Sequence, residues 1–88
     1  MGAPVPGEII LIFRGTHQVL SAEKLLKRAG VAMRLIPVPR SLTSDCGLAI
    51  RLSPSGIDRA RDVLSDAGLL PYSVHILRRE GGYEQAPL

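Results

Sequence analysis

A continuous run of apolar residues near the start of the chain, Ile9 to Phe13, constrains the fold more than any other feature. The run shows no polar alternation and is rich in β-branched side chains, which is typical of a strand buried on both faces. Such a strand belongs in the middle of a sheet. Arg14-Gly15 ends the run, and the remaining elements must be arranged around it.

A first amphipathic helix is predicted directly after this strand. Apolar residues recur at three- and four-residue spacing over residues 19–29, with charged residues between them. Thr16 is suited to the N-cap, because its hydroxyl can accept a hydrogen bond from a first-turn amide. Gly30 supplies the left-handed end of the helix.

A second helix is predicted to begin at Ser53-Pro54, where a capping residue precedes a proline in the first turn. Its buried stripe runs over residues 57–67, and Gly68 closes it. Gly56 lies in the first turn and costs about 1 kcal/mol relative to alanine, so we expect the start of this helix to be weak.

Three further strands are expected at residues 31–36, 48–52 and 71–77. The two halves of the chain are similar, because Ala29-Gly30 and Ala67-Gly68 each end a helix and precede a strand. The order strand, helix, strand, strand, helix, strand predicts an α+β, ferredoxin-like split βαβ fold, with a four-stranded antiparallel sheet and both helices on one face. Right-handed crossovers would put the first and third strands in the centre.

We expect one domain over residues 8–78, with flexible termini at residues 1–7 and 79–88. The sheet face without helices would be half apolar and half basic, so it could lie in solvent or form a homodimer or partner surface. The residues predicted for this face beside the first strand are Arg34, Ala49, Arg51, Ser73 and His75.

Composition narrows the class of protein. The chain has 88 residues, 45% of them hydrophobic and only 3% aromatic, so a single aliphatic core is expected. The net charge of +3 comes from scattered residues, 11 Lys and Arg against 8 Asp and Glu, which we interpret as ordinary surface. No apolar stretch approaches the roughly 18 residues that a membrane span needs. One cysteine and no signal peptide favour a cytoplasmic protein.

That cysteine, Cys46, lies in the longest polar interruption of the chain, residues 37–47, and is the leading candidate for chemistry. The thiolate is the reactive form of cysteine, and nearby cations stabilise it. Arg40 in the same loop and a close approach of the Gly47 amide would favour an anion, whereas Asp45 would disfavour it. Cys46 as a small buried hydrophobe is an equally good interpretation.

Other chemistry has less support. A metal site would need further ligands at suitable spacing, and a redox dithiol needs a second cysteine, which this sequence lacks. His17 is suited to acid–base work near a helix start, although a solvated first-turn residue is the more ordinary interpretation, and no hydrolytic arrangement can be argued from spacing. We therefore expect no enzymatic activity. RNA-binding modules of this architecture stack bases on aromatic residues of the central strands, where this chain has only Phe13, so nucleic acid is not the expected partner.

The sequence resembles a family of small bacterial selenium/sulfur carrier-like proteins, first catalogued as a domain of unknown function, over about residues 9–77. The motifs that carry the resemblance are Thr16-His17, Ala22-Glu23-Lys24-Leu25-Leu26, Leu35-Ile36-Pro37, Pro39-Arg40, Ser44, Cys46-Gly47-Leu48-Ala49 and Ala67-Gly68.

The resemblance implies a carrier that holds selenium or sulfur on Cys46 as a perselenide or persulfide, with no other cofactor. It implies a donor, such as a cysteine-desulfurase-like enzyme, and an acceptor protein. Gly47, Pro39, Arg40 and Ser44 would form the supporting loop, with Thr16 and His17 as accessory residues. The alternatives are a cytosolic interaction or regulatory module that uses the open sheet face, and a small RNA-binding module.

Overall fold

The computed structural model describes residues 7–39, 42 and 47–86, and it is built around the predicted central strand. This strand, β1 (Ile9–Ile12), is buried along its whole length. It pairs with β3 (Leu48–Leu52) on one side and with β4 (Ser73–Leu77) on the other. The sheet continues through β2 (Met33–Pro37) on the β3 side, so the first and third strands are central, as predicted.

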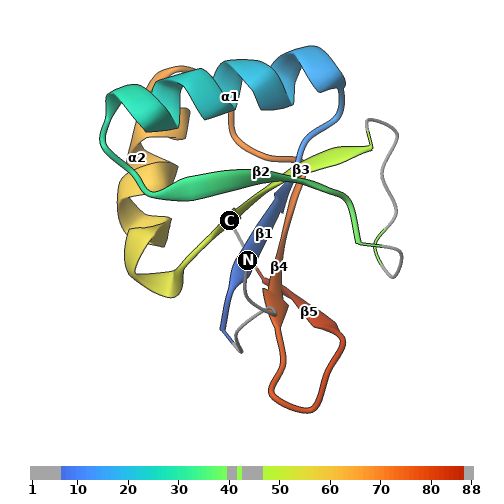
Figure 1. The fold of residues 1–88 in the computed structure, drawn as a ribbon. Coiled ribbons are helices and arrows are strands. Elements are labelled where there is room, and N and C mark those ends of the chain that lie inside the picture. The colour runs from blue at the N-terminus through green and yellow to red at the C-terminus, as the bar shows by residue number, and fades with distance from the viewer. Residues whose placement is uncertain (1–6, 40–41, 43–46, 87–88) are drawn as a thin grey trace.

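Every pairing in the sheet is antiparallel, as predicted. The predicted number of four strands is wrong, because the sheet has five, in the order β2-β3-β1-β4-β5. The added strand, β5 (Tyr83–Ala86), lies in the segment for which the sequence predicts a flexible tail. A hairpin brings it back along β4, with Arg78 N–H donating to Gly82 O at 3.0 Å. The tail therefore contributes an edge strand (Figure 1).

The predicted N-terminal arm, residues 1–7, lies outside the described residues except for Gly7. The N–H of Gly7 donates to Leu77 O at 2.9 Å, and Leu77 N–H donates to Glu8 O at the same distance. The β1–β4 ladder thus extends back to Gly7, which belongs to the sheet rather than to an arm.

Helix α1 (Thr16–Arg28) agrees with the predicted span, but its N-cap is Gly15 rather than Thr16. The second helix begins with a 3₁₀ turn, η1 (Pro54–Gly56), and continues as α2 (Ile57–Asp66). Gly56 explains this irregular start, since its low helix propensity falls where the first α-helical turn would form. Both helices end as predicted, at Gly30 and Gly68, with φ of 77° and 70°.

The main core lies between the helices and one sheet face. Ile9 and Leu11 of β1 point to it, together with Val19 and Leu26 of α1 and Leu64 of α2. Because residues 9 and 11 share a face of the strand, both helices must cover the same side of the sheet. Figure 1 shows this two-layer arrangement, with α1 lying across β2 and β3. The predicted two-helix layer is confirmed.

Candidate functional site

The most important sequence-predicted residue, Cys46, lies outside the residues that the structure describes, as do Arg40 and Ser44. The described part of the same loop consists of Val38, Pro39, Leu42 and Gly47. Val38 N–H donates to Gly47 O at 3.0 Å, directly beyond the last β2–β3 pair. The loop that carries the cysteine is therefore closed at its base by a backbone hydrogen bond.

Gly47, the residue to which Cys46 is bonded, is exposed and has φ of 76°. Any residue other than glycine is strained in this left-handed conformation. Among the described residues other than its chain neighbours, none has an atom within 4 Å of the position that a Cβ would take beside Gly47. The left-handed conformation thus explains why glycine follows Cys46, and the exposed Gly47 leaves room for a partner to approach.

Topology brings a second group of residues to this end of the sheet. Because β1 and β3 are antiparallel, the end of β1 at Ile12 pairs with Ala49, near the start of β3. The turn after β1 therefore starts at the same end, and it leads into the first turn of α1, where Thr16 and His17 are exposed. That turn of the helix contains no acidic residue, so the positive end of the helix dipole is not neutralised from within it.

Arg14 and Tyr72 form a further pair at this end that sequence reasoning missed. The Arg14 guanidinium carbon lies 4.3 Å from the centroid of the Tyr72 ring, a cation–π geometry. Tyr72 N–H donates to Ile12 O at 2.7 Å, which fixes the residue beside the end of β1. Arg14 and Tyr72 are far apart in the sequence, so no local pattern predicts their contact. The pattern around Tyr72 predicts only a strand.

A hollow of about 290 Å³ lies at this pair. Gln18, Leu70 and Pro71 contribute to its wall along with the two side chains, and residues 13–18 and 69–72 include no acid. Leu70 and Tyr72 are 47% and 57% exposed, unusually high for large apolar side chains. Among the described residues that line this hollow, one cation, Arg14, therefore lies beside exposed apolar surface.

The opposite sheet face, which carries no helix, has an apolar middle that is shielded from solvent. Ile10 and Ile12 point to this face, yet each is only 1% exposed. They form a second apolar cluster with Ala49, and partly buried side chains pack against it. These covering residues are Ile36, Val38, Leu42 and Tyr83. Side chains from the base of the cysteine loop and from the unpredicted strand β5 thus pack against the apolar middle of the face.

The polar residues predicted for this face are present around the second cluster. Arg34 lies directly opposite Arg51 on the neighbouring strand. Arg51 Nε is 3.1 Å from a carboxylate oxygen of Glu8, and both side chains are largely shielded from solvent. Of the two opposing arginines, Arg51 is therefore shielded and bound to Glu8, whereas Arg34 is exposed.

His75 and Ser73 also lie on this face, adjacent to β1. The Ser73 hydroxyl and His75 Nε2 are 3.0 Å apart and hydrogen-bonded. Burial lowers the pKa of His75, because the charged imidazolium is desolvated there. In the described part of the chain, no three His, Cys, Asp or Glu side chains gather as a metal site would require. No helix in that part is long and apolar enough to cross a membrane.

The described elements define a small α+β protein whose cysteine-bearing loop joins an edge strand to a central strand. A family model described as "Putative Se/S carrier protein-like" matches residues 8–76, and the chain belongs to this family. The "Uncharacterized protein YtiA" of Escherichia coli (strain K12) is 37% identical over 46 residues, which are 52% of this chain and 54% of that relative. The chain thus spans about half the length of this curated relative. No solved structure matches.

Proposed function

We propose that this protein carries sulfur or selenium on Cys46 and passes it to an acceptor protein, without an enzymatic turnover of its own. The observation that carries the proposal is the family match, which spans residues 8–76 and therefore includes the loop of Cys46. The chain has no second cysteine, so a loaded Cys46 has no thiol within the chain that could displace its cargo as a disulfide.

The transfer needs no cofactor and no external oxidant. The Cys46 thiolate attacks the terminal sulfur of a persulfide on the donor protein, a new sulfur–sulfur bond forms on Cys46, and the donor cysteine leaves as a thiolate. The acceptor nucleophile then attacks the terminal sulfur in the same way and releases the Cys46 thiolate. Selenium follows the same steps as a perselenide. Both steps require an accessible, deprotonated thiol.

Features at the loop end of the sheet support this chemistry. Gly47 is exposed, and no described residue beyond its chain neighbours crowds it, which favours the approach of a protein-bound persulfide to the neighbouring residue. The first turn of α1, with Thr16 and His17, and the guanidinium of Arg14 contribute positive potential, which stabilises a thiolate or persulfide anion. In this proposal Arg40 and Ser44 complete the loop around the anion, with Pro39 at its base.

The proposed partners are a cysteine-desulfurase-like donor and an acceptor protein, which would meet the carrier in the cytoplasm. Leu70 and Tyr72 give these partners an exposed apolar contact beside Arg14. Tyrosine and arginine are the residue types that contribute most to protein interfaces. A docked partner would therefore cover this end of the sheet and reach the cysteine loop.

The two alternative functions have less support. An interaction module would need the open sheet face, but the apolar middle of that face is occupied by the second cluster. An RNA-binding module would stack bases on Phe13, but this side chain is 2% exposed and belongs to the main core.

Intact-mass measurement after incubation with a persulfide-generating desulfurase tests the proposal. We expect the wild-type chain to gain one sulfur, to lose it on reduction, and to gain none as Cys46→Ala. Because any thiol can accept sulfur slowly, a peptide spanning residues 37–49 is the matched control, and the folded protein should load faster. Equal loading of Cys46→Ala, or a peptide that loads as fast as the folded chain, would contradict the carrier role.

A further inference from the structure

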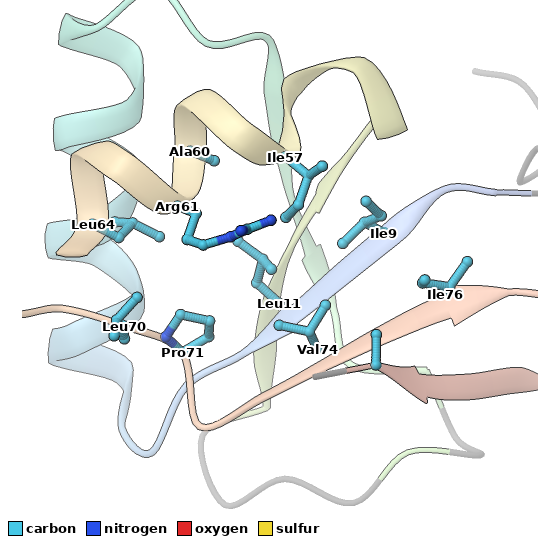
Figure 2. A pocket seen from close by; sticks show the side chains of 11 residues that line it. Ile9, Leu11, Ile57, Ala60, Arg61, Leu64, Leu70, Pro71, Val74 and Ile76 are labelled. Carbon is cyan, nitrogen blue, oxygen red and sulfur yellow. The ribbon is translucent and has the colours of Figure 1, made fainter. Parts of the chain in front are cut away.

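An apolar groove runs between α2 and the β4–β5 side of the sheet, on the helix-covered face. Ile57 and Leu64 line its helix wall, and Leu11, Val74 and Ala86 line its sheet wall. Its volume is about 200 Å³. Figure 2 shows these side chains converging on one space from the helix and from three strands.

The fifth strand provides a physical reason for this groove. Five strands about 4.8 Å apart form a layer roughly 24 Å wide, whereas two helices packed about 10 Å apart cover roughly 20 Å. Helix α1 lies over β2 and β3, so α2 alone remains to cover the β4–β5 side. A strip of the helix-facing surface is therefore left between α2 and the last two strands.

One cation enters this apolar space. Arg61 is the only charged side chain among the described residues that line the groove, and Figure 2 shows it extending from α2 between the helix and the strands. Its Nη2 is 3.2 Å from an Asp58 oxygen, but Asp58 is 90% exposed, and such solvent-exposed pairs are weak. A guanidinium has five N–H donors, so this contact leaves donors for a second carboxylate.

We propose that the groove binds a small aliphatic monocarboxylate, with its hydrocarbon chain between α2 and the strands and its carboxylate on Arg61. Mostly apolar walls with one placed charge are the usual composition of a small-molecule site. If a methylene needs about the same room as a water molecule, roughly 30 Å³, the 200 Å³ groove takes a chain of about six to seven carbons. Because the carboxylate carbon is not counted in that chain, octanoate, which has seven further carbons, is the longest straight chain that fits.

Titration of the ¹⁵N-labelled protein with butanoate, hexanoate, octanoate and decanoate tests the proposal, with amide shifts as the readout. We expect saturating shifts at Val74, Ala86 and the α2 residues. Each added methylene should tighten binding about fourfold, because burial of a methylene is worth about 0.8 kcal/mol. The gain should stop between octanoate and decanoate. Cys46→Ala should bind equally well, so this site is tested independently of the carrier role.

Two variants separate the roles of charge and space. Arg61→Gln should weaken hexanoate binding about fivefold, as expected for an exposed charge-assisted contact worth about 1 kcal/mol, and should not change the weaker binding of hexan-1-ol. Arg28→Gln removes the same charge from α1, outside the groove, and is the matched control. Ala86→Phe should fill the groove and abolish binding of every chain.

Three results would overturn the proposal. The first is no saturating shift with millimolar octanoate. The second is equal affinity for hexanoate and hexan-1-ol that Arg61→Gln leaves unchanged, which would remove the case for a carboxylate. The third is shifts of the same residues on raising the protein concentration alone, which would show that a second copy of the chain occupies the groove.

Discussion

Replacing Gly47 with alanine tests whether backbone conformation requires the glycine that follows Cys46. Gly47 has φ of 76°, and no described residue beyond its chain neighbours comes within 4 Å of the position that the alanine Cβ would occupy, so the cost is expected from the backbone. A left-handed conformation costs an L-residue about 1–2 kcal/mol. Alanine also restricts the unfolded chain, which returns about 0.4–1 kcal/mol. We therefore expect Gly47→Ala to lower the free energy of unfolding by up to about 1.6 kcal/mol, with a central value of about 0.8 kcal/mol.

The assay is urea denaturation, in which we expect the m-value to stay unchanged. In a thermal scan, Tm should fall by about 4–8 °C for each kcal/mol lost, as expected for a domain of this size. Gly47→Asn should lose less, because asparagine tolerates the left-handed region better than alanine. Gly56→Ala is the matched control: its φ is −97°, and the nearest atom to a new Cβ is a Val31 methyl at 3.6 Å, an ordinary contact. This control should gain about 0.4–1 kcal/mol.

The reasoning would be refuted if Gly47→Ala were as stable as the wild type while Gly56→Ala gained stability. That result would mean that the base of the loop can take a second conformation at no cost. A loss in Gly47→Asn equal to that in Gly47→Ala would also count against it, because a backbone preference must separate the two. The rate of Cys46 alkylation in the same variants would show whether the conformation of Gly47 matters to the thiol.

Two further predictions concern the core and the sheet face. Leu26 is fully buried in the main core, so Leu26→Ala should lower the free energy of unfolding in urea by about 2–5 kcal/mol. Leu20 is 42% exposed, so Leu20→Ala should lower it clearly less. Equal losses in the two variants would contradict the assignment of the core. Burial lowers the pKa of His75 in the folded state. Between that lowered pKa and the unfolded value of about 6.5, the unfolded state binds more protons than the folded state. The free energy of unfolding should therefore fall as the pH drops through this window. His75→Gln should flatten that dependence while His17→Gln, at an exposed position, should not; an unchanged slope in His75→Gln would refute it.

Much of the fold could be predicted because its signals are local. The apolar run of β1 has one good solution, the centre of a sheet. The glycines that end the two helices have the left-handed conformation that their positions require. The weak start of the second helix followed from Gly56 and is seen as a 3₁₀ turn.

Strand β5 was missed for a physical reason. Tyr83–Ala86 is short and mostly polar, so it has no hydrophobic alternation, and its conformation depends on pairing with β4. A signal was nevertheless present, because a short polar segment that contains Gly81 and Gly82 directly after a predicted strand is typical of a longer hairpin loop. Both glycines have positive φ, 97° and 77°. The consequences of the miss were large, since β5 helps to cover one sheet face and to form the groove on the other.

The sequence by itself determined the single thiol, the glycine beside it and the order of the elements, because each depends on residue type or on neighbours a few positions away. The tertiary structure alone decided what surrounds them. Arg14 meets Tyr72 only because β4 returns to the end of β1, and the cluster of Ile10 and Ile12 is buried because side chains of a loop and of a late strand pack against it. Such contacts join residues distant in sequence, so they depend on strand register and helix placement, which no local pattern specifies.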